Sequence, residues 1–131
     1  MRLGRKLGAL AAILVLAAAG IAIGSGWDRF AGGSAKGQNP VATAGGQVNK
    51  PRAIRVRIKS RPRGMKIGAQ WATTCAKGTK SGSRGDQFRG RTPIKRRLRL
   101  RFRNPDVCNA WAKAGMRGQG KLRVILSAQK Q

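Results

Sequence analysis

The chain contains no glutamate, histidine or tyrosine, and its 131 residues include only three aspartates and two cysteines. Without histidine it lacks the usual proton carrier of general acid–base catalysis and the commonest metal ligand. Its three acids, Asp28, Asp86 and Asp106, lie far apart in the sequence, so a pair of catalytic carboxylates is not supported. No serine is marked as a nucleophile by a neighbouring base. The sequence therefore predicts that the protein is not an enzyme and has no catalytic residues, metal or cofactor.

Acidic charge is almost absent, whereas 29 lysines and arginines bring the formal net charge to +26. A chain this basic accumulates on polyanions such as nucleic acid, anionic lipid or acidic polymers, because its electrostatic field attracts them whatever its fold. The same charge opposes compaction through self-repulsion. We therefore expect a feature that offsets this repulsion.

Residues 1–26 predict a signal peptide or a membrane anchor. Arg2, Arg5 and Lys6 precede an uncharged run of 18 residues, 7–24. This run is slightly long for the apolar core of a signal peptide, roughly 7–15 residues, and close to the lower limit of roughly 17 for a spanning helix. Cleavage and retention both stay open, and Trp27 is of a type found at membrane interfaces. Either way we expect the rest of the chain to be extracytoplasmic, secreted or anchored to the cell membrane, as in a small bacterial envelope protein.

Two cysteines in an exported chain predict one disulfide, and Cys75 with Cys108 is the only possible pair. Closing a loop of this length is worth roughly 3–4 kcal/mol in the chain-entropy model. A free thiol or a metal pair is the alternative, but the chain offers no histidine or third cysteine to complete a metal site. We expect the bridge to offset the charge repulsion.

The composition divides the chain into three parts. Residues 27–52 are rich in glycine, alanine and small polar residues and show no apolar period, which is typical of a flexible linker. The sequence therefore predicts a signal or anchor over 1–26, a linker over 27–52 and a basic β domain over 53–131.

The predicted β domain alternates apolar and basic residues with the period of a β-strand. We expect strands at 53–59, 65–75, 94–103, 107–114 and 121–128, with a mobile loop at 77–86. The spacing predicts an all-β fold, a small antiparallel β-sandwich that is immunoglobulin-like or an open barrel. By analogy with immunoglobulins, the disulfide would join strands of facing sheets.

Two tryptophans of the β domain have different expected positions. Trp71 shares a strand face with Met65 and Ile67, so we expect it in the core, the usual place of a tryptophan in a small domain. Trp111 points opposite Cys108 along its strand, and both a buried and an exposed position stay open.

Arginine occupies every second position from 97 to 103. If these strands share a sheet with 53–59, their outer face carries about ten cations and no acid, and like charges opposite one another destabilise a sheet. Arginine also suits bidentate contact with phosphate or carboxylate. A solvated basic face, with arginine enriched by genome composition, is the alternative. The candidate polyanion-binding residues are Arg55, Arg57, Lys59, Arg97, Arg99, Arg101 and Arg103.

The sequence thus predicts an exported or tethered envelope protein that binds anionic polymers or surfaces electrostatically. Anionic lipid, an envelope polymer and extracellular nucleic acid are the candidate partners, the last bound without sequence preference. The alternative is a structural or interaction module that docks an envelope protein, and an exposed apolar, uncharged patch would favour it. A membrane-disrupting cationic protein would need an inserting apolar face, which these strands use for the core. Oligomeric state is left open.

Overall fold

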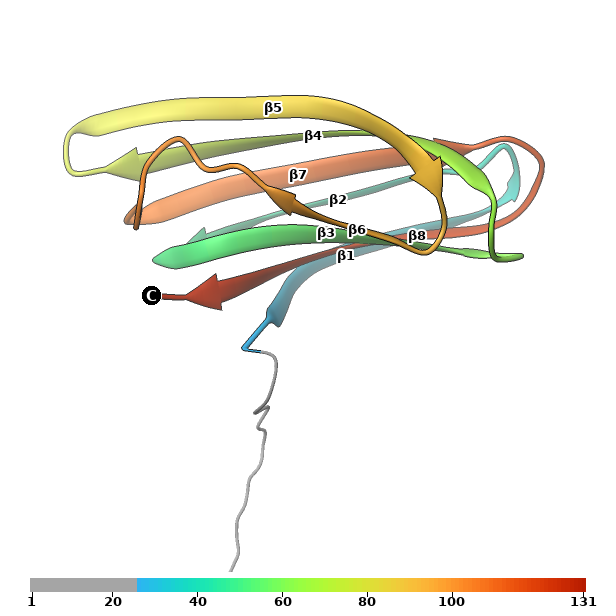
Figure 1. Ribbon diagram of the computed structural model, residues 1–131, viewed down its shortest axis with the longest axis horizontal. Coiled ribbons are helices and arrows are strands. Elements are labelled where there is room, and N and C mark those ends of the chain that lie inside the picture. The colour runs from blue at the N-terminus through green and yellow to red at the C-terminus, as the bar shows by residue number, and fades with distance from the viewer. Residues whose placement is uncertain (1–25) are drawn as a thin grey trace, which may run out of the picture.

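The computed structural model describes residues 26–131, which form eight β-strands (Figure 1). The strands are β1 (Asp28–Gln38), β2 (Val41–Asn49), β3 (Pro51–Arg61), β4 (Lys66–Lys77), β5 (Lys80–Arg91), β6 (Ile94–Leu98), β7 (Val107–Met116) and β8 (Gln119–Lys130). The predicted signal or anchor falls almost entirely on residues 1–25, outside the described part. Within residues 26–131 there is no helix that could cross a membrane.

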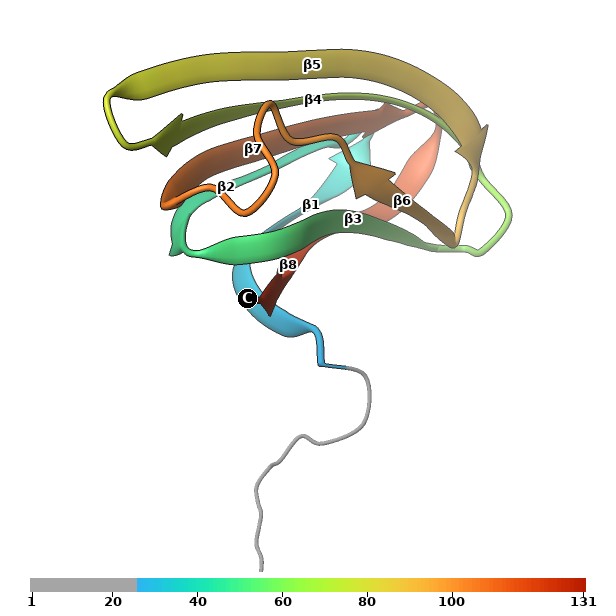
Figure 2. The same ribbon diagram turned by 60° about the vertical axis from the view of Figure 1, so that its left-hand side comes forward.

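The strands pair as nested antiparallel hairpins: β1 with β8, β2 with β7, β3 with β6, and β4 with β5. Further pairing of β3 with β8 and of β4 with β7 produces two four-stranded sheets. We call β1-β8-β3-β6 the lower sheet and β2-β7-β4-β5 the upper sheet, as they lie in Figures 1 and 2. The predicted all-β antiparallel sandwich is confirmed, and its connectivity is that of a jelly roll.

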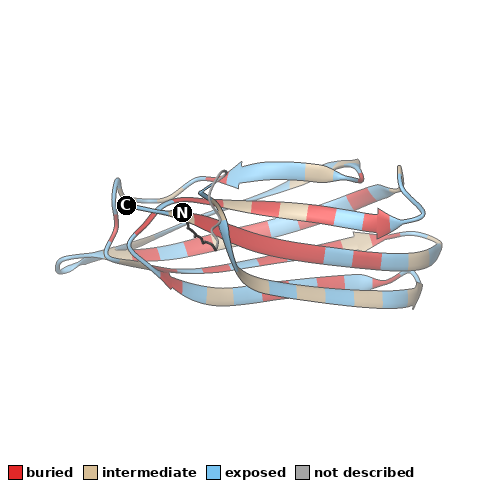
Figure 3. Ribbon diagram, turned by 90° about the horizontal axis from the view of Figure 1, so that it is seen from below, coloured by how far each residue is buried: buried red, intermediate tan, exposed pale blue. Residues whose placement is uncertain are grey.

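The core between the sheets combines large aliphatic side chains with small ones. Alternate residues of β3 and β8 point inward from the lower sheet, among them Ile54 and Leu122. From the upper sheet, β7 contributes small residues such as Ala112. Trp71 of β4 belongs to the same cluster with 7% of its surface exposed, which confirms its expected place in the core. Figure 3 shows the resulting alternation of buried and exposed positions along the strands.

The disulfide joins Cys75 and Cys108, with an S–S distance of 2.09 Å, so the predicted pairing is confirmed. The two residues face each other on the neighbouring strands β4 and β7 of the upper sheet, with their Cα atoms 4.1 Å apart. The expectation of a bridge between facing sheets is therefore wrong. The error arose because β1 and β2 were not predicted as strands. Without them, the strands could not be assigned correctly to the two sheets.

Residues 27–52, predicted as a flexible linker, instead provide the first two strands. β1 pairs along β8, and β2 pairs along β7. Their glycines and alanines give little contrast between the two strand faces, so no period is visible in the sequence. Small residues are needed here because a Cβ atom at Gly33 would overlap the carbonyl oxygen of Thr43. The folded domain accordingly begins at β1 and not at residue 53.

Residues 77–86, predicted as a mobile loop, form the tip of the β4–β5 hairpin. β4 continues to Lys77, β5 begins at Lys80, and these two residues are opposite one another in the register. The carboxylate of Asp106 accepts a hydrogen bond from the backbone N–H of Gly78, 2.8 Å away, and so holds the turn in place. Pairing with β4 thus orders a segment whose glycine, serine and lysine content is typical of a loop.

Candidate polyanion-binding surface

The outer face of the lower sheet presents basic side chains in rows that cross the strands. One row consists of Arg29 on β1, Ser127 on β8, Arg55 on β3 and Arg97 on β6. The following rows repeat the pattern, and each contains at least two cations. We call this surface the basic face; its cations are Arg29, Lys36, Arg55, Arg57, Lys59, Arg61, Lys95, Arg97, Lys121 and Arg123.

Cations stand directly opposite one another on this face, without an acid between them. Arg55 is opposite Arg97, and Arg57 is opposite Lys95, on the paired strands β3 and β6. None of the three aspartates lies in these rows. Among residues 26–131 one ion pair is formed, between Arg99 and Asp86 at 3.4 Å, and it belongs to a different surface. The positive charge of the basic face is therefore not neutralised by any acid within the described chain.

Four of the seven candidate residues lie together on the basic face: Arg55, Arg57, Lys59 and Arg97. The other three, Arg99, Arg101 and Arg103, do not, because β6 ends at Leu98 and the chain then crosses to the upper sheet. The hydroxyl of Thr73 on β4 donates a hydrogen bond to the carbonyl oxygen of Arg99 at 2.9 Å. The arginine alternation continues past Leu98, where β6 ends although β3 extends further to Pro51, so it does not predict the end of the strand.

A stacked cluster occupies one end of the basic face. Trp27, directly before β1, lies beside the guanidinium groups of Arg55 and Arg97, which are 4.5 and 5.8 Å from its ring centroid. The Nε atom of Arg55 is buried and has no hydrogen-bond partner within residues 26–131. Burial first, and then the charge of Arg57, lower the pKa of the Arg55 guanidinium. Trp27, Arg55 and Arg97 form what we call the arginine–tryptophan cluster.

Sequence reasoning did not place the cations that β1 and β8 add to the basic face. Lys121 and Arg123 alternate with buried Leu122 and Val124, so the β8 pattern indicates their outward direction, but not that β8 lies beside β3. Arg29 and Lys36 were not predicted to lie on a strand, because β1 has the composition of a linker. The position of β8 and β1 in the lower sheet follows only from the register.

The outer face of the upper sheet differs sharply in charge. It exposes Trp111 and Val41, at 42% and 57%, the two large hydrophobic residues that are exposed within the described chain. The cross-strand neighbours of Trp111 are Gly45 on β2 and Ala72 on β4, so its ring stands among small side chains. The question left open for Trp111 is thereby settled in favour of an exposed position.

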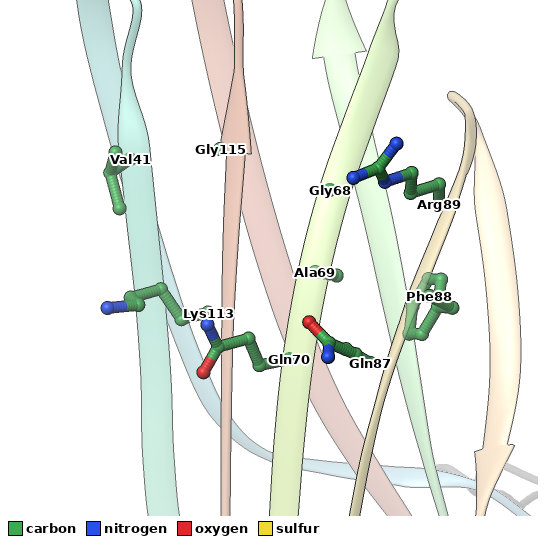
Figure 4. A pocket seen from close by; sticks show the side chains of 9 residues that line it. All are labelled: Val41, Gly68, Ala69, Gln70, Gln87, Phe88, Arg89, Lys113 and Gly115. Carbon is green, nitrogen blue, oxygen red and sulfur yellow. The ribbon is translucent and has the colours of Figure 1, made fainter.

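A shallow groove of about 630 Å³ lies on this face, which carries fewer cations than the basic face (Figure 4). Gly68 and Gly115 leave its floor open, and Figure 4 shows the amide of Gln70 directed toward Lys113 and that of Gln87 directed toward β4. Lys113 and Arg89 supply positive charge at its margin. The groove has the features of a contact surface but contains no grouping of acid, base and nucleophile.

No group of three or more histidine, cysteine, aspartate or glutamate residues is placed to hold a metal ion in the part of the chain that the structure describes. No protein-family model and no curated protein matches the chain. Function must therefore be inferred from the surfaces alone, since a fold does not imply a function.

Proposed function

We propose that the protein binds anionic polymers or surfaces through the basic face. The observation that supports this most is the concentration of ten cations on one side of one sheet, with no aspartate among them. Binding of this kind is electrostatic and independent of sequence, so nucleic acid would be bound through its phosphates. From the uncharged run at 7–24 we further propose that the domain is extracytoplasmic, either secreted or held at the cell membrane.

The basic face is costly to the folded state, and this favours a role in binding. Like charges on directly opposite residues destabilise a sheet, whereas alternating signs would stabilise it. No acid of the described chain relieves the repulsion between Arg55 and Arg97 or between Arg57 and Lys95. A polyanion placed on this face would neutralise both pairs at once. The guanidinium groups would in addition form bidentate hydrogen bonds with phosphate or carboxylate.

The test compares two variants of equal charge in a chain that begins at Gly26 and so retains all eight strands. One variant replaces four cations of the basic face by glutamine: Arg57, Lys59, Lys95 and Arg123. The other replaces Lys66, Arg89, Lys113 and Arg117, which lie elsewhere. Each variant is titrated with duplex DNA and with anionic vesicles over a range of salt.

We expect the basic-face variant to lose far more affinity than the control, for DNA and vesicles alike. Each phosphate that the protein no longer neutralises lowers the steepness of log affinity against log salt by about 0.9, so four such phosphates lower it by roughly 3–4. Equal losses in the two variants would mean that the charge acts generically and that the basic face is not a site. Circular dichroism of both variants checks that the fold is retained.

The second candidate function, an interaction module that docks an envelope protein, is favoured by one observation. Trp111 and Val41 are exposed on the outer face of the upper sheet, away from the basic face. Exposed aromatic residues are enriched in the centres of protein interfaces. If the basic-face variant and the control bind polyanions equally, this candidate becomes the preferred one.

A further inference from the structure

The arginine–tryptophan cluster differs from the rest of the basic face because its guanidinium groups are held in place. The five donors of a guanidinium lie in its plane, so a group beside an aromatic ring keeps its N–H edges free to bind an anion. Arg55 and Arg97, on opposite positions of β3 and β6, share the ring of Trp27. Two neighbouring guanidinium groups in fixed positions are suited to one phosphate, which accepts hydrogen bonds from both.

No acid of the described chain neutralises the charges of the cluster. Arg29 belongs to the same row, but its guanidinium group lies over Gly32 of the next row, so the cluster itself contains two guanidinium groups. The Nε of Arg55 is buried and meets no acceptor in the described chain, so only the terminal N–H groups of this guanidinium can reach an anion. Asp28, the acid nearest in sequence, is opposite Ala128 in the register and does not belong to this row. A bound phosphate would neutralise this charge and accept hydrogen bonds from the terminal N–H groups of the two guanidinium groups.

The position of Trp27 in the chain indicates where that phosphate comes from. The uncharged run 7–24 ends three residues before Trp27. Three residues span at most about 11 Å even when fully extended. The polar layer on each side of a bilayer is roughly 5–8 Å thick. If the run enters a membrane, Trp27 must therefore lie within or beside the head groups, whatever conformation residues 1–25 adopt, and tryptophan favours that position.

We propose that Trp27, Arg55 and Arg97 form a binding site for the head-group phosphate of an anionic phospholipid in the membrane that the N-terminal run enters. The proposal rests on the proposed function and names its ligand: the basic face lies on the bilayer, and the cluster is its most ordered contact. The outer face of the upper sheet, with Trp111, then points away from the membrane, since it belongs to the opposite sheet.

The experiment uses the full chain in nanodiscs of phosphatidylcholine, with or without phosphatidylglycerol. A nitroxide on the lipid head group quenches nearby tryptophan fluorescence, and Trp27 is the reporter because Trp71 is buried and Trp111 lies on the opposite sheet. We compare the double variant Arg55→Gln/Arg97→Gln with Arg61→Gln/Lys121→Gln. The control removes the same charge from another cross-strand pair of the basic face, away from the cluster.

We expect phosphatidylglycerol to increase quenching in the natural chain and in the control. Both double variants lose two cations of the basic face, so both should lose part of this increase. In the cluster variant the increase should be at least about fivefold smaller than in the control, which corresponds to about 1 kcal/mol beyond the loss of charge. The variant Arg55→Lys/Arg97→Lys keeps the charge but not the planar forks, and we expect it to fall between these two. A Trp27→Phe variant confirms which tryptophan reports.

The remaining outcomes each overturn a different claim. If the increase in quenching falls equally in the cluster variant and the control, the phosphate site is overturned. The basic face would then attract anionic lipid only through its total charge. The quenching could be unaffected by phosphatidylglycerol while the chain still binds duplex DNA through the basic face. That result would overturn the lipid as ligand and retain the proposed function. A chain that responds to neither would overturn both.

Discussion

Replacing Lys95 with glutamate tests whether the basic face destabilises the fold. Lys95 lies on β6, the last strand of the lower sheet, and its one cross-strand partner is Arg57. Lys95→Gln removes a like-charge pair, and Lys95→Glu converts it into an opposite-charge pair. Opposite charges across a sheet contribute roughly 0.2–1 kcal/mol, and like charges oppose folding by a similar amount. We therefore expect stability to rise by about 0.5 kcal/mol for Lys95→Gln and by about 1 kcal/mol for Lys95→Glu.

Thermal unfolding followed by circular dichroism measures this rise. For a domain of this size 1 kcal/mol corresponds to an increase in Tm of roughly 4 °C. Because about 0.1 M salt screens charges beyond about 10 Å, added salt should stabilise the natural chain more than Lys95→Glu. Lys113→Glu is the control, since Lys113 is opposite Thr43 and Gln70 and has no cation to pair with.

Stability and binding should change in opposite directions. Lys95→Glu should melt at a higher temperature and bind DNA more weakly than the natural chain. If it is less stable than the natural chain, or if Lys113→Glu is stabilised as much, then the cations of the basic face do not repel one another appreciably. Their cost to the fold would then no longer favour a binding role.

Three further predictions concern the fold and the pH dependence. Reducing the Cys75–Cys108 bridge should lower the free energy of unfolding by roughly 3–4 kcal/mol, as measured by urea titration with and without reductant. Gly33→Val should destabilise the domain by roughly 1–3 kcal/mol because its side chain would overlap Thr43. Gly68→Val, where a Cβ meets nothing within 4 Å, should stay within roughly 0.5 kcal/mol in the same titration. Affinity for duplex DNA should be constant between about pH 6 and about pH 8, because the chain has no histidine and both cysteines are bridged, and a clear dependence would contradict the assignment of binding to arginine and lysine.

The sequence was sufficient to predict which way most side chains point. Alternation around Ile54, Val56 and Ile58 correctly predicted a strand with Arg55 and Arg57 outward, because burial of one face imposes a period of two. The disulfide followed from there being only two cysteines. These inferences are local: they depend on the residue types within one strand or on the number of cysteines.

The sequence was insufficient wherever the answer depended on a partner strand. Arg97 and Arg101 belong to the same alternation, yet only Arg97 has a partner on β3, and the other lies beyond the end of β6. β1 was missed because close approach to β2 requires glycine at position 33, which removes the hydrophobic signal. The basic face is thus a product of register, since β1 and β8 add cations that no local pattern assigns to it.

Lysine acetylation footprinting tests the central claim most directly, without any substitution. The folded protein is acetylated with and without duplex DNA or anionic vesicles, and the extent at each lysine is measured by mass spectrometry. Lys36, Lys59, Lys95 and Lys121 lie on the basic face, whereas Lys66, Lys80 and Lys113 lie elsewhere, and all are exposed. We predict that the ligand protects the first group and leaves the second group reactive. Equal protection of both groups, or protection of the second alone, would contradict binding through the basic face.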